Sequence, residues 1–246
     1  MDDVLTGSGT RAAPPRPTTA VSPRQLSPER VVQAAVEFVD KHGLAELSMR
    51  RLGAYLGVDP MALYRHVAGR DALLDAVVEV VVEDVLDTMR RETADSSSWQ
   101  DYLHRLAFAV RGAALEHPQV FPLVATRPPA APWLRPPLRS VRWVELFLST
   151  LRRAGFTGRQ AVAAYRAFTS FLLGHLLLEV SALGVDTGPE PELEPDGDTE
   201  DLDDFPTVRG LQPELTEDHS AAEFQRALDD LLARVEEMRL GEDPAV

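Results

Sequence analysis

Between residues 47 and 74, cationic and hydroxyl-bearing side chains stand at spacings that suit contact with nucleic acid. An arginine guanidinium can donate two hydrogen bonds to one guanine, which discriminates between bases by about 1–3 kcal/mol. Tyrosine and histidine can bind phosphate oxygens, which fixes position but carries no sequence information. Proline, methionine and alanine side chains donate no hydrogen bonds but can touch thymine methyl groups. The candidate contact residues are Ser48, Arg50, Pro60, Met61, Ala62, Tyr64, Arg65, His66 and Arg70.

Two short helices joined by a tight turn must position these side chains. Ser48 can cap the first helix, and Gly57 suits its C-terminus. Asp59 and Pro60 then start a second helix over residues 61–67, as a cap and as a first-turn proline. This arrangement predicts a helix-turn-helix, whose second helix enters the major groove of DNA.

Alternatives stay open for several of these residues. Arg50 can contact a phosphate or lie free on the surface instead of binding a base, and Tyr64 can pack partly into the core. Arg70 is expected to anchor the DNA backbone, whereas Arg51 is expected on the surface. Residues 1–25 form either an inert disordered tail or a basic arm that reaches the minor groove.

The stretch around these helices resembles the DNA-binding domain of the tetracycline-repressor (TetR) family over about fifty residues. The matching motifs are Leu26-Ser27-Pro28, Ala34-Ala35, His42-Gly43-Leu44, Leu47-Ser48-Met49-Arg50, Leu52-Gly53, Leu56-Gly57-Val58, Leu63-Tyr64, His66-Val67 and Leu73-Leu74. The resemblance implies that Arg50 contacts a base and that Tyr64 and His66 hold phosphates. Pro60 stands where the tetracycline repressor has a glutamine, so that repressor's operator sequence is not implied.

A second resemblance covers the C-terminal half. Ala125-Thr126-Arg127-Pro128, Ala154-Gly155-Phe156 and Phe171-Leu172-Leu173-Gly174 are similar to the ligand-binding domain of the branch that contains the tetracycline repressor. Together the resemblances imply an all-α fold, with an N-terminal three-helix DNA-binding domain and a larger C-terminal domain for ligand binding and dimerisation. The expected segments are an N-terminal arm (1–25), a helix-turn-helix domain (26–72) and a ligand-binding domain (73–246) with a flexible acidic loop at 185–215.

Apolar spacing predicts the helices of the larger domain. A helix over 70–93 is favoured over a strand despite its many valines, because more than twenty residues are too long for an ordinary strand. Further helices are expected at 99–117, 120–124, 138–154, 157–183 and 218–240, and a proline-rich loop at 127–137. The helix at 157–183 is apolar nearly all round and must be covered on both sides. The family resemblance implies that it and the last helix form the homodimer interface.

Aromatic and polar side chains in this domain are candidates for a ligand pocket, although each aromatic can equally be plain core. The candidates are His104, Phe108, Phe121, Arg127, Trp143, Phe147, Phe168, Phe171 and His175. His175 and Glu179 share a helical face and could hold a metal, but a hydrogen-bonded core pair explains them as well. The resemblance places Leu123 and Leu178 where the tetracycline repressor binds a magnesium chelate. Leucine offers no oxygen ligand, so no metal or cofactor and a more apolar effector are expected.

Charge distribution and missing motifs restrict the classes of protein to which this chain can belong. The net charge is −14, but residues 186–246 hold 20 acidic and 4 basic side chains, so residues 1–185, with 19 and 21, are slightly positive. The chain has no cysteine, no signal peptide and no apolar run that approaches a membrane span, which favours the cytoplasm. It lacks phosphate-loop, nucleophile-elbow and paired metal motifs, so it is not expected to be an enzyme.

The expected function is a dimeric transcriptional regulator that binds a two-fold symmetric DNA operator. We expect a repressor that a small-molecule effector releases from DNA. Activation, or a regulator of the same fold without small-molecule gating, remains open from sequence.

Overall fold

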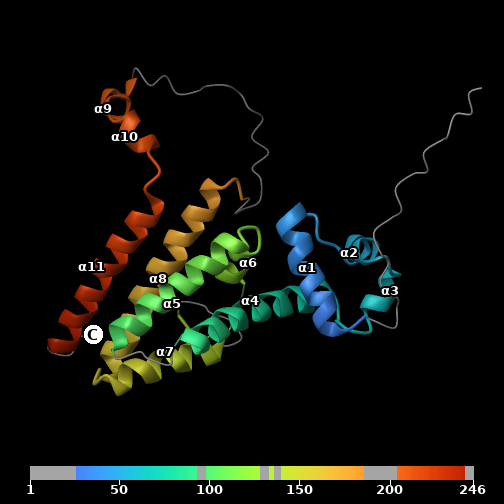
Figure 1. Cartoon of the computed structure of the whole chain (residues 1–246), viewed down its shortest axis with the longest axis horizontal. Helices are drawn as coiled ribbons and strands as arrows, with labels where there is room; N and C mark the ends of the chain where they lie inside the picture. The colour runs from blue at the N-terminus through green and yellow to red at the C-terminus, as the bar shows by residue number, and fades with distance from the viewer. Residues whose placement is uncertain (1–25, 93–97, 128–132, 136–139, 186–203, 242–246) are drawn as a thin grey trace, which may run out of the picture.

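The computed structural model describes residues 26–92, 98–127, 133–135, 140–185 and 204–241. All regular secondary structure in these residues is helical, as predicted (Figure 1). The expected N-terminal arm and most of the proline-rich loop lie outside the described residues. A small three-helix unit lies at one end of the molecule and the larger helical domain at the other, and the long helix α4 runs between them (Figure 1).

Local sequence signals fix the three small helices. Helix α1 (Pro28–His42) begins at Ser27, whose hydroxyl accepts a hydrogen bond from the Arg30 amide at 3.2 Å. Helix α2 (Met49–Leu56) begins in the same way at Ser48 and ends at Gly57, which has a left-handed φ of 68°. Helix α3 spans only Pro60–Leu63, so the predicted extension to residue 67 is wrong. Residues 64–66 instead form a tight turn.

Helix α4 (Arg70–Glu92) confirms that length outweighs the strand preference of its valines. Its first half packs with α1, α2 and α3 in one hydrophobic cluster, the head core, through Val77, Val78 and Val81. Its second half packs in a separate cluster, the body core, through Val85 and Met89. The expected domain boundary at 72/73 falls near the start of this helix, and the head core continues several residues beyond it.

The body core is built from α5 (Trp99–Glu116), α6 (Phe121–Thr126), α7 (Val141–Arg153), α8 (Gly158–Ala182) and α11 (Ser220–Leu240). Helix α8 begins with a reciprocal capping box between Thr157 and Gln160. The Gln160 Nε2 also donates to the Met238 carbonyl at 2.8 Å, which ties the start of α8 to the end of α11. Val120 and Leu123, at the start of α6, pack in the head core rather than the body core.

A partly buried ion pair joins α5 to α8 in the body. The Arg111 Nε lies 3.1 Å from each carboxylate oxygen of Glu179, and Nη2 donates to the same group. The guanidinium also lies 5.5 Å from the centre of the Phe224 ring on α11. The Glu179 carboxylate therefore binds Arg111. The two sequence-based alternatives, a metal held with His175 and a hydrogen-bonded pair with His175, do not describe these contacts.

The end of the loop expected at 185–215 differs from the prediction. It holds two short helices, α9 (Pro206–Gly210) and α10 (Gln212–Thr216, which ends one residue beyond the expected loop), neither of which has a buried residue. Residues 186–203 lie outside the described part. On α11 the buried residues are Phe224, Leu228, Leu232 and Val235, and Leu231 and Met238 pack partly buried against the same core.

Helix α8 is long and apolar enough to cross a membrane by length and composition, contrary to the expectation that no such run exists. The core helix of a soluble protein passes the same test, so this is weak evidence for a membrane span. In the structure Phe168, Leu172 and Leu176 are buried in the body core.

We predict that Glu179→Gln destabilises the protein by about 2 kcal/mol, because it leaves the partly buried Arg111 charge without its carboxylate. Replacing both partners, as Arg111→Met with Glu179→Leu, should recover most of the loss. Chemical denaturation at one protein concentration measures both. The matched control is Glu83→Gln, since Glu83 pairs with Arg142 at the exposed surface and such pairs contribute about 0–1 kcal/mol. Equal losses from Glu179→Gln and Glu83→Gln would contradict the prediction.

Candidate DNA-binding head and effector pocket

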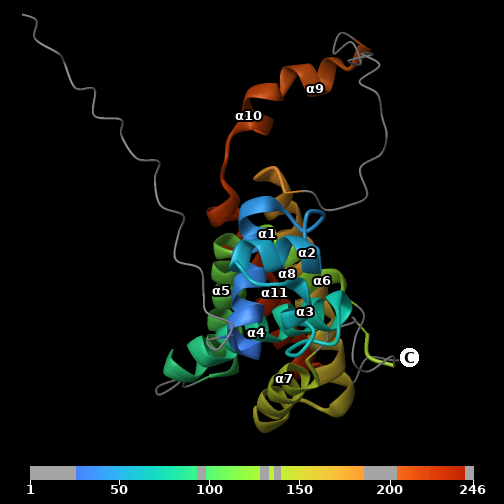
Figure 2. The same cartoon turned by 90° about the vertical axis from the view of Figure 1, so that its right-hand side faces the viewer.

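Most of the predicted DNA-contact residues lie on α2, α3 and the turn that follows, at the end of the molecule that faces the viewer in Figure 2, while Ser48 caps α2 and Arg70 begins α4. Met61 is 69% and Tyr64 is 48% exposed, and Arg50 and Arg65 are also exposed. The other candidates at the tip, Pro60, Ala62 and His66, are half-buried. The exposed side chains are therefore available to a partner, whereas Leu63 between them is fully buried and holds α3 to the head core.

The turn between α2 and α3 is fixed by close backbone contacts. A Cβ on Gly53 would lie 3.1 Å from the Val58 carbonyl oxygen and 3.3 Å from the Pro60 Cα, so a larger residue would push α3 away from α2. The Asp59 carboxylate accepts from the Met61 amide at 2.7 Å and caps α3. The backbone that carries Met61 and Tyr64 is thus held in one orientation before any DNA is bound.

Two arginines of the head have partners within the protein. The Arg70 Nε donates to the Leu47 carbonyl at 3.0 Å and its Nη2 to the Leu44 carbonyl at 3.4 Å, which joins α4 to the segment before α2. Its expected contact with the DNA backbone remains a prediction. Arg51 forms an ion pair with Glu46 at the surface.

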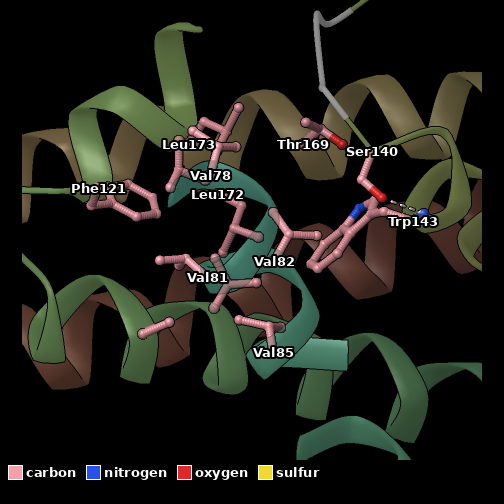
Figure 3. Close-up of a pocket in the computed structure, with 13 residues that line it drawn as sticks. Val78, Val81, Val82, Val85, Phe121, Ser140, Trp143, Thr169, Leu172 and Leu173 are labelled. Carbon is pink, nitrogen blue, oxygen red and sulfur yellow. Dashed lines mark hydrogen bonds between the residues drawn. The ribbon is translucent and has the colours of Figure 1, made fainter. Parts of the chain in front are cut away.

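A mostly apolar cavity of about 50 Å³ lies where α4, α5, α6, α7 and α8 meet (Figure 3). The Ser140 hydroxyl accepts from the Trp143 amide at 3.3 Å. Thr169 is buried and hydrogen-bonds Tyr165, and burial raises the pKa of that phenol to about 12, so it stays neutral. The lining residues are Val78, Val81, Val82, Val85, Val110, Ala113, Phe121, Val124, Ser140, Trp143, Thr169, Leu172 and Leu173.

Among these lining residues, only Phe121 and Trp143 were predicted from the sequence. The valines of α4 were not predicted, because their spacing by itself indicates only a helix with an apolar face. Leu172 and Leu173 were not predicted either, although they lie in a motif that carries the resemblance. The spacing of the α4 valines is the signal from which the wall could have been identified.

The other predicted ligand residues lie elsewhere. Phe147 and Phe168 are fully buried and contact each other in the body core, as the plain-core alternative held. Phe171 and His175 pack against Phe224 of α11. His104 and Phe108 line a second hollow between α4 and α5. The apolar cavity thus brings together two of the nine candidates.

Among the residues that the structure describes, no group of three His, Asp or Glu side chains is placed to hold a metal ion. Leu123 is buried in the head core and Leu178 is 76% exposed. Neither side chain can supply an oxygen ligand.

Polar contacts tie the region of the cavity to the head. The Arg127 Nε, just after α6, lies 2.7 Å from a carboxylate oxygen of Asp75, and its Nη2 lies 3.0 Å from the Asp71 carbonyl. These contacts make Arg127 a link from α6 to α4. The His117 Nδ1 lies 2.6 Å from an Asp40 oxygen on α1, and burial raises the pKa of Asp40 although His117 opposes the shift.

Comparison with known proteins identifies relatives of both halves. The family described as "Bacterial regulatory proteins, tetR family" matches residues 31–77, and "Tetracyclin repressor-like, C-terminal domain" matches residues 93–239. An HTH-type transcriptional regulator of Saccharopolyspora erythraea is 30% identical over 63% of this chain and 61% of its own. The repressor DrrR1 of Streptomyces coeruleorubidus is 30% identical over 65% and 55%. The chain thus spans about 61% and 55% of the lengths of these relatives.

Other relatives match over more of their length. The class C tetracycline repressor of Escherichia coli is 29% identical over 88% of this chain and 93% of its own. A possible TetR regulator from Streptomyces coelicolor has a solved structure with a TM-score of 0.68 and 29% identity, covering 86% of this chain and all of that chain. ActR from the same organism, solved with (S)-DNPA, has a TM-score of 0.63 at 23% identity, which shows the fold alone.

These curated relatives are named as transcriptional regulators and repressors, which are not enzymes. The C-terminal family alone matches more than half of the sequence, and the N-terminal family matches the helix-turn-helix that the structure contains. The chain belongs to the TetR family.

Proposed function

We propose that this protein is a homodimeric, cytoplasmic transcriptional repressor that a small, largely apolar ligand releases from a two-fold symmetric DNA operator. The observation that carries the proposal is that α4 forms a wall of the apolar cavity and also belongs to the head core. A ligand that displaces this wall therefore acts on the element that orients the head.

DNA binding rests on the head. Its exposed Arg50, Tyr64 and Arg65 stand on a rigid helix-turn-helix and have the chemistry for base and phosphate contact. In a dimer, two such heads must match successive major grooves, roughly 34–36 Å apart or a near multiple. The ligand can shift the protein away from that spacing only by its differential affinity for the two arrangements.

Dimerisation rests on the exposed apolar side chains of α8 and α11. Leu178 is 76% exposed near the end of α8, and Leu240 is 72% exposed at the end of α11. Val162, near the start of α8, is also exposed. A second copy that packs α8 and α11 against the same pair would remove these groups from water.

One observation favours the runner-up function, a DNA-binding regulator of the same fold without small-molecule gating. The cavity of about 50 Å³ is well below the roughly 300–1,000 Å³ of typical ligand sites. Gating therefore requires that the ligand expand the cavity, whereas a regulator without gating would keep it closed. Release of DNA by a bound ligand decides between the two.

We predict that Arg50→Ala relaxes base preference at one operator position and weakens specific binding by about 10- to 100-fold, because a bidentate contact is lost. Tyr64→Phe should weaken binding more uniformly across sequences. Selection from a random DNA pool at fixed salt measures both. Arg51→Ala, whose side chain pairs with Glu46, is the control. An enriched consensus that Arg50→Ala leaves unchanged would exclude Arg50 from base contact.

We predict that Ala113→Phe, which fills the cavity, preserves operator binding and abolishes release by apolar ligands. Fluorescence anisotropy of labelled operator during ligand titration measures release. The control is Leu115→Phe, on the outer side of the same helix, where the side chain is already 37% exposed. Ligands that raise the melting temperature of the unsubstituted protein without releasing DNA would favour the runner-up function.

We predict that Leu178→Glu converts the dimer to a monomer, because it places a charge in the proposed interface. Sedimentation velocity measures the mass of the assembly. The same change at Leu115 adds a charge to an exposed site on α5, outside α8 and α11, and should leave the mass unchanged. A dimer that survives Leu178→Glu would show that Leu178 lies outside the interface.

A further inference from the structure

The apolar cavity adjoins a hollow at the surface between α4 and the start of α7, which we name the α4–α7 mouth. The mouth has a volume of about 350 Å³, and Val141, one of its lining residues, is 48% exposed. Val78, Val82 and Ser140 line both the mouth and the cavity. The side chains of these three residues therefore stand between the cavity and the surface.

This wall is less deeply buried than the wall on the side of α5. Val82 and Ser140 are only half-buried, although Val78 beside them is buried in the head core. On the side of α5, Val81 and Val85 are each 5% exposed and belong to the head core and the body core. Because close-packed side chains resist displacement, the wall should open more readily at Val82 and Ser140 than at the α4–α5 contact.

An ion pair spans the mouth. The Nη1 of Arg142 lies 3.0 Å from each carboxylate oxygen of Glu83, which joins the start of α7 to α4. Arg90 also lies 3.5 Å from Glu83, but both of these residues are on α4, so their contact does not cross the mouth. The side chains of Arg142 and Glu83 are 55% and 44% exposed, so water can replace their contact at small cost. This pair can therefore hold the two helices together and still separate readily.

The size of the cavity makes an opening of this kind necessary. Its volume of about 50 Å³ is far below that of a typical ligand site, so an organic molecule enters only if the surrounding helices move apart. Separation of α7 from α4 at the mouth would join the cavity to a hollow that already exists. It would also leave Val81 and Val85 packed in their two cores.

We propose that small apolar molecules enter and leave the apolar cavity through the α4–α7 mouth, and that the Arg142–Glu83 ion pair is a latch that opens for their passage. The inference rests on the proposed function in one respect, because the molecule that enters would be the effector. Passage itself involves no DNA, so it is measured independently of repression.

Binding kinetics of an uncharged fluorescent probe, N-phenyl-1-naphthylamine, test the latch on the full-length protein by stopped flow. Arg142→Ala should raise the association and dissociation rate constants of the probe by the same factor, about two- to fivefold, as expected from the loss of an exposed ion pair. The dissociation constant should stay within twofold, because a latch affects the path and not the bound state. Ala113→Phe, which fills the cavity, should abolish binding and so show where the probe binds.

Exchange of the two charges distinguishes a latch from a general structural effect. Glu83→Ala should act like Arg142→Ala, whereas Glu83→Arg combined with Arg142→Glu restores an ion pair and should return both rate constants toward those of the unsubstituted protein. Val141→Phe adds bulk in the mouth and should lower both. The matched control is Gly112→Phe, which adds bulk in the hollow between α4 and α5, where a new side chain meets no neighbouring atom. It should leave both rate constants unchanged.

Several results would overturn the proposal. Rate constants that Arg142→Ala leaves unchanged would exclude the latch, and slower binding to the Gly112→Phe protein would place the route at the α4–α5 side. Absence of probe binding, or binding that survives Ala113→Phe, would show that the probe does not enter the cavity. A probe that passes the latch but does not release operator DNA would count against the proposed function alone.

Discussion

Helix α4 is packed into two hydrophobic cores at once, and the rest of the structure depends on this constraint. Val77 and Val78 are buried with α1 and the helix-turn-helix, whereas Val85 and Met89 are buried with α5 and its neighbours. Protein interiors are close-packed, so a helix cannot tilt in one core without repacking the other. The orientation of the head relative to the body therefore depends on how α4 packs in the two cores.

Helix α6 and its N-cap residue also contribute side chains to both the head core and the body core. Val120 and Leu123 face the head core, while Phe121 faces the body core and the apolar cavity. Less than one helical turn thus separates side chains that belong to different cores. Arg127 adds an ionic link from the end of this helix to α4. Two routes of packed side chains, one through α4 and one through α6, thus connect the cavity to the head core.

Local signals in the sequence predicted the helices well, because each depends on neighbours within a few residues. The cap at Ser48 and the left-handed Gly57 are of this kind. Interactions between distant residues were not predictable. Arg111 and Glu179, for example, are 68 positions apart. The apolar cavity is likewise lined by five helices. Aromatic residues in the sequence therefore predicted only Phe121 and Trp143 of its lining, and the valines of α4 were not predicted. The short helices α9 and α10 carry no buried residues, so no apolar periodicity marked them.

The contribution of α6 to the head core has a consequence for the growing chain during synthesis. The residues that form α1, α2 and α3 leave the ribosome first, but Val120 and Leu123 are translated about 50 residues after the end of the helix-turn-helix. At roughly 5–20 residues per second, this is a delay of several seconds. During that time the part of the head core on α4 that α6 covers is exposed. A nascent chain therefore carries all of the predicted DNA-contact residues before it carries a complete head core, so the head depends on residues translated after α5 to finish folding.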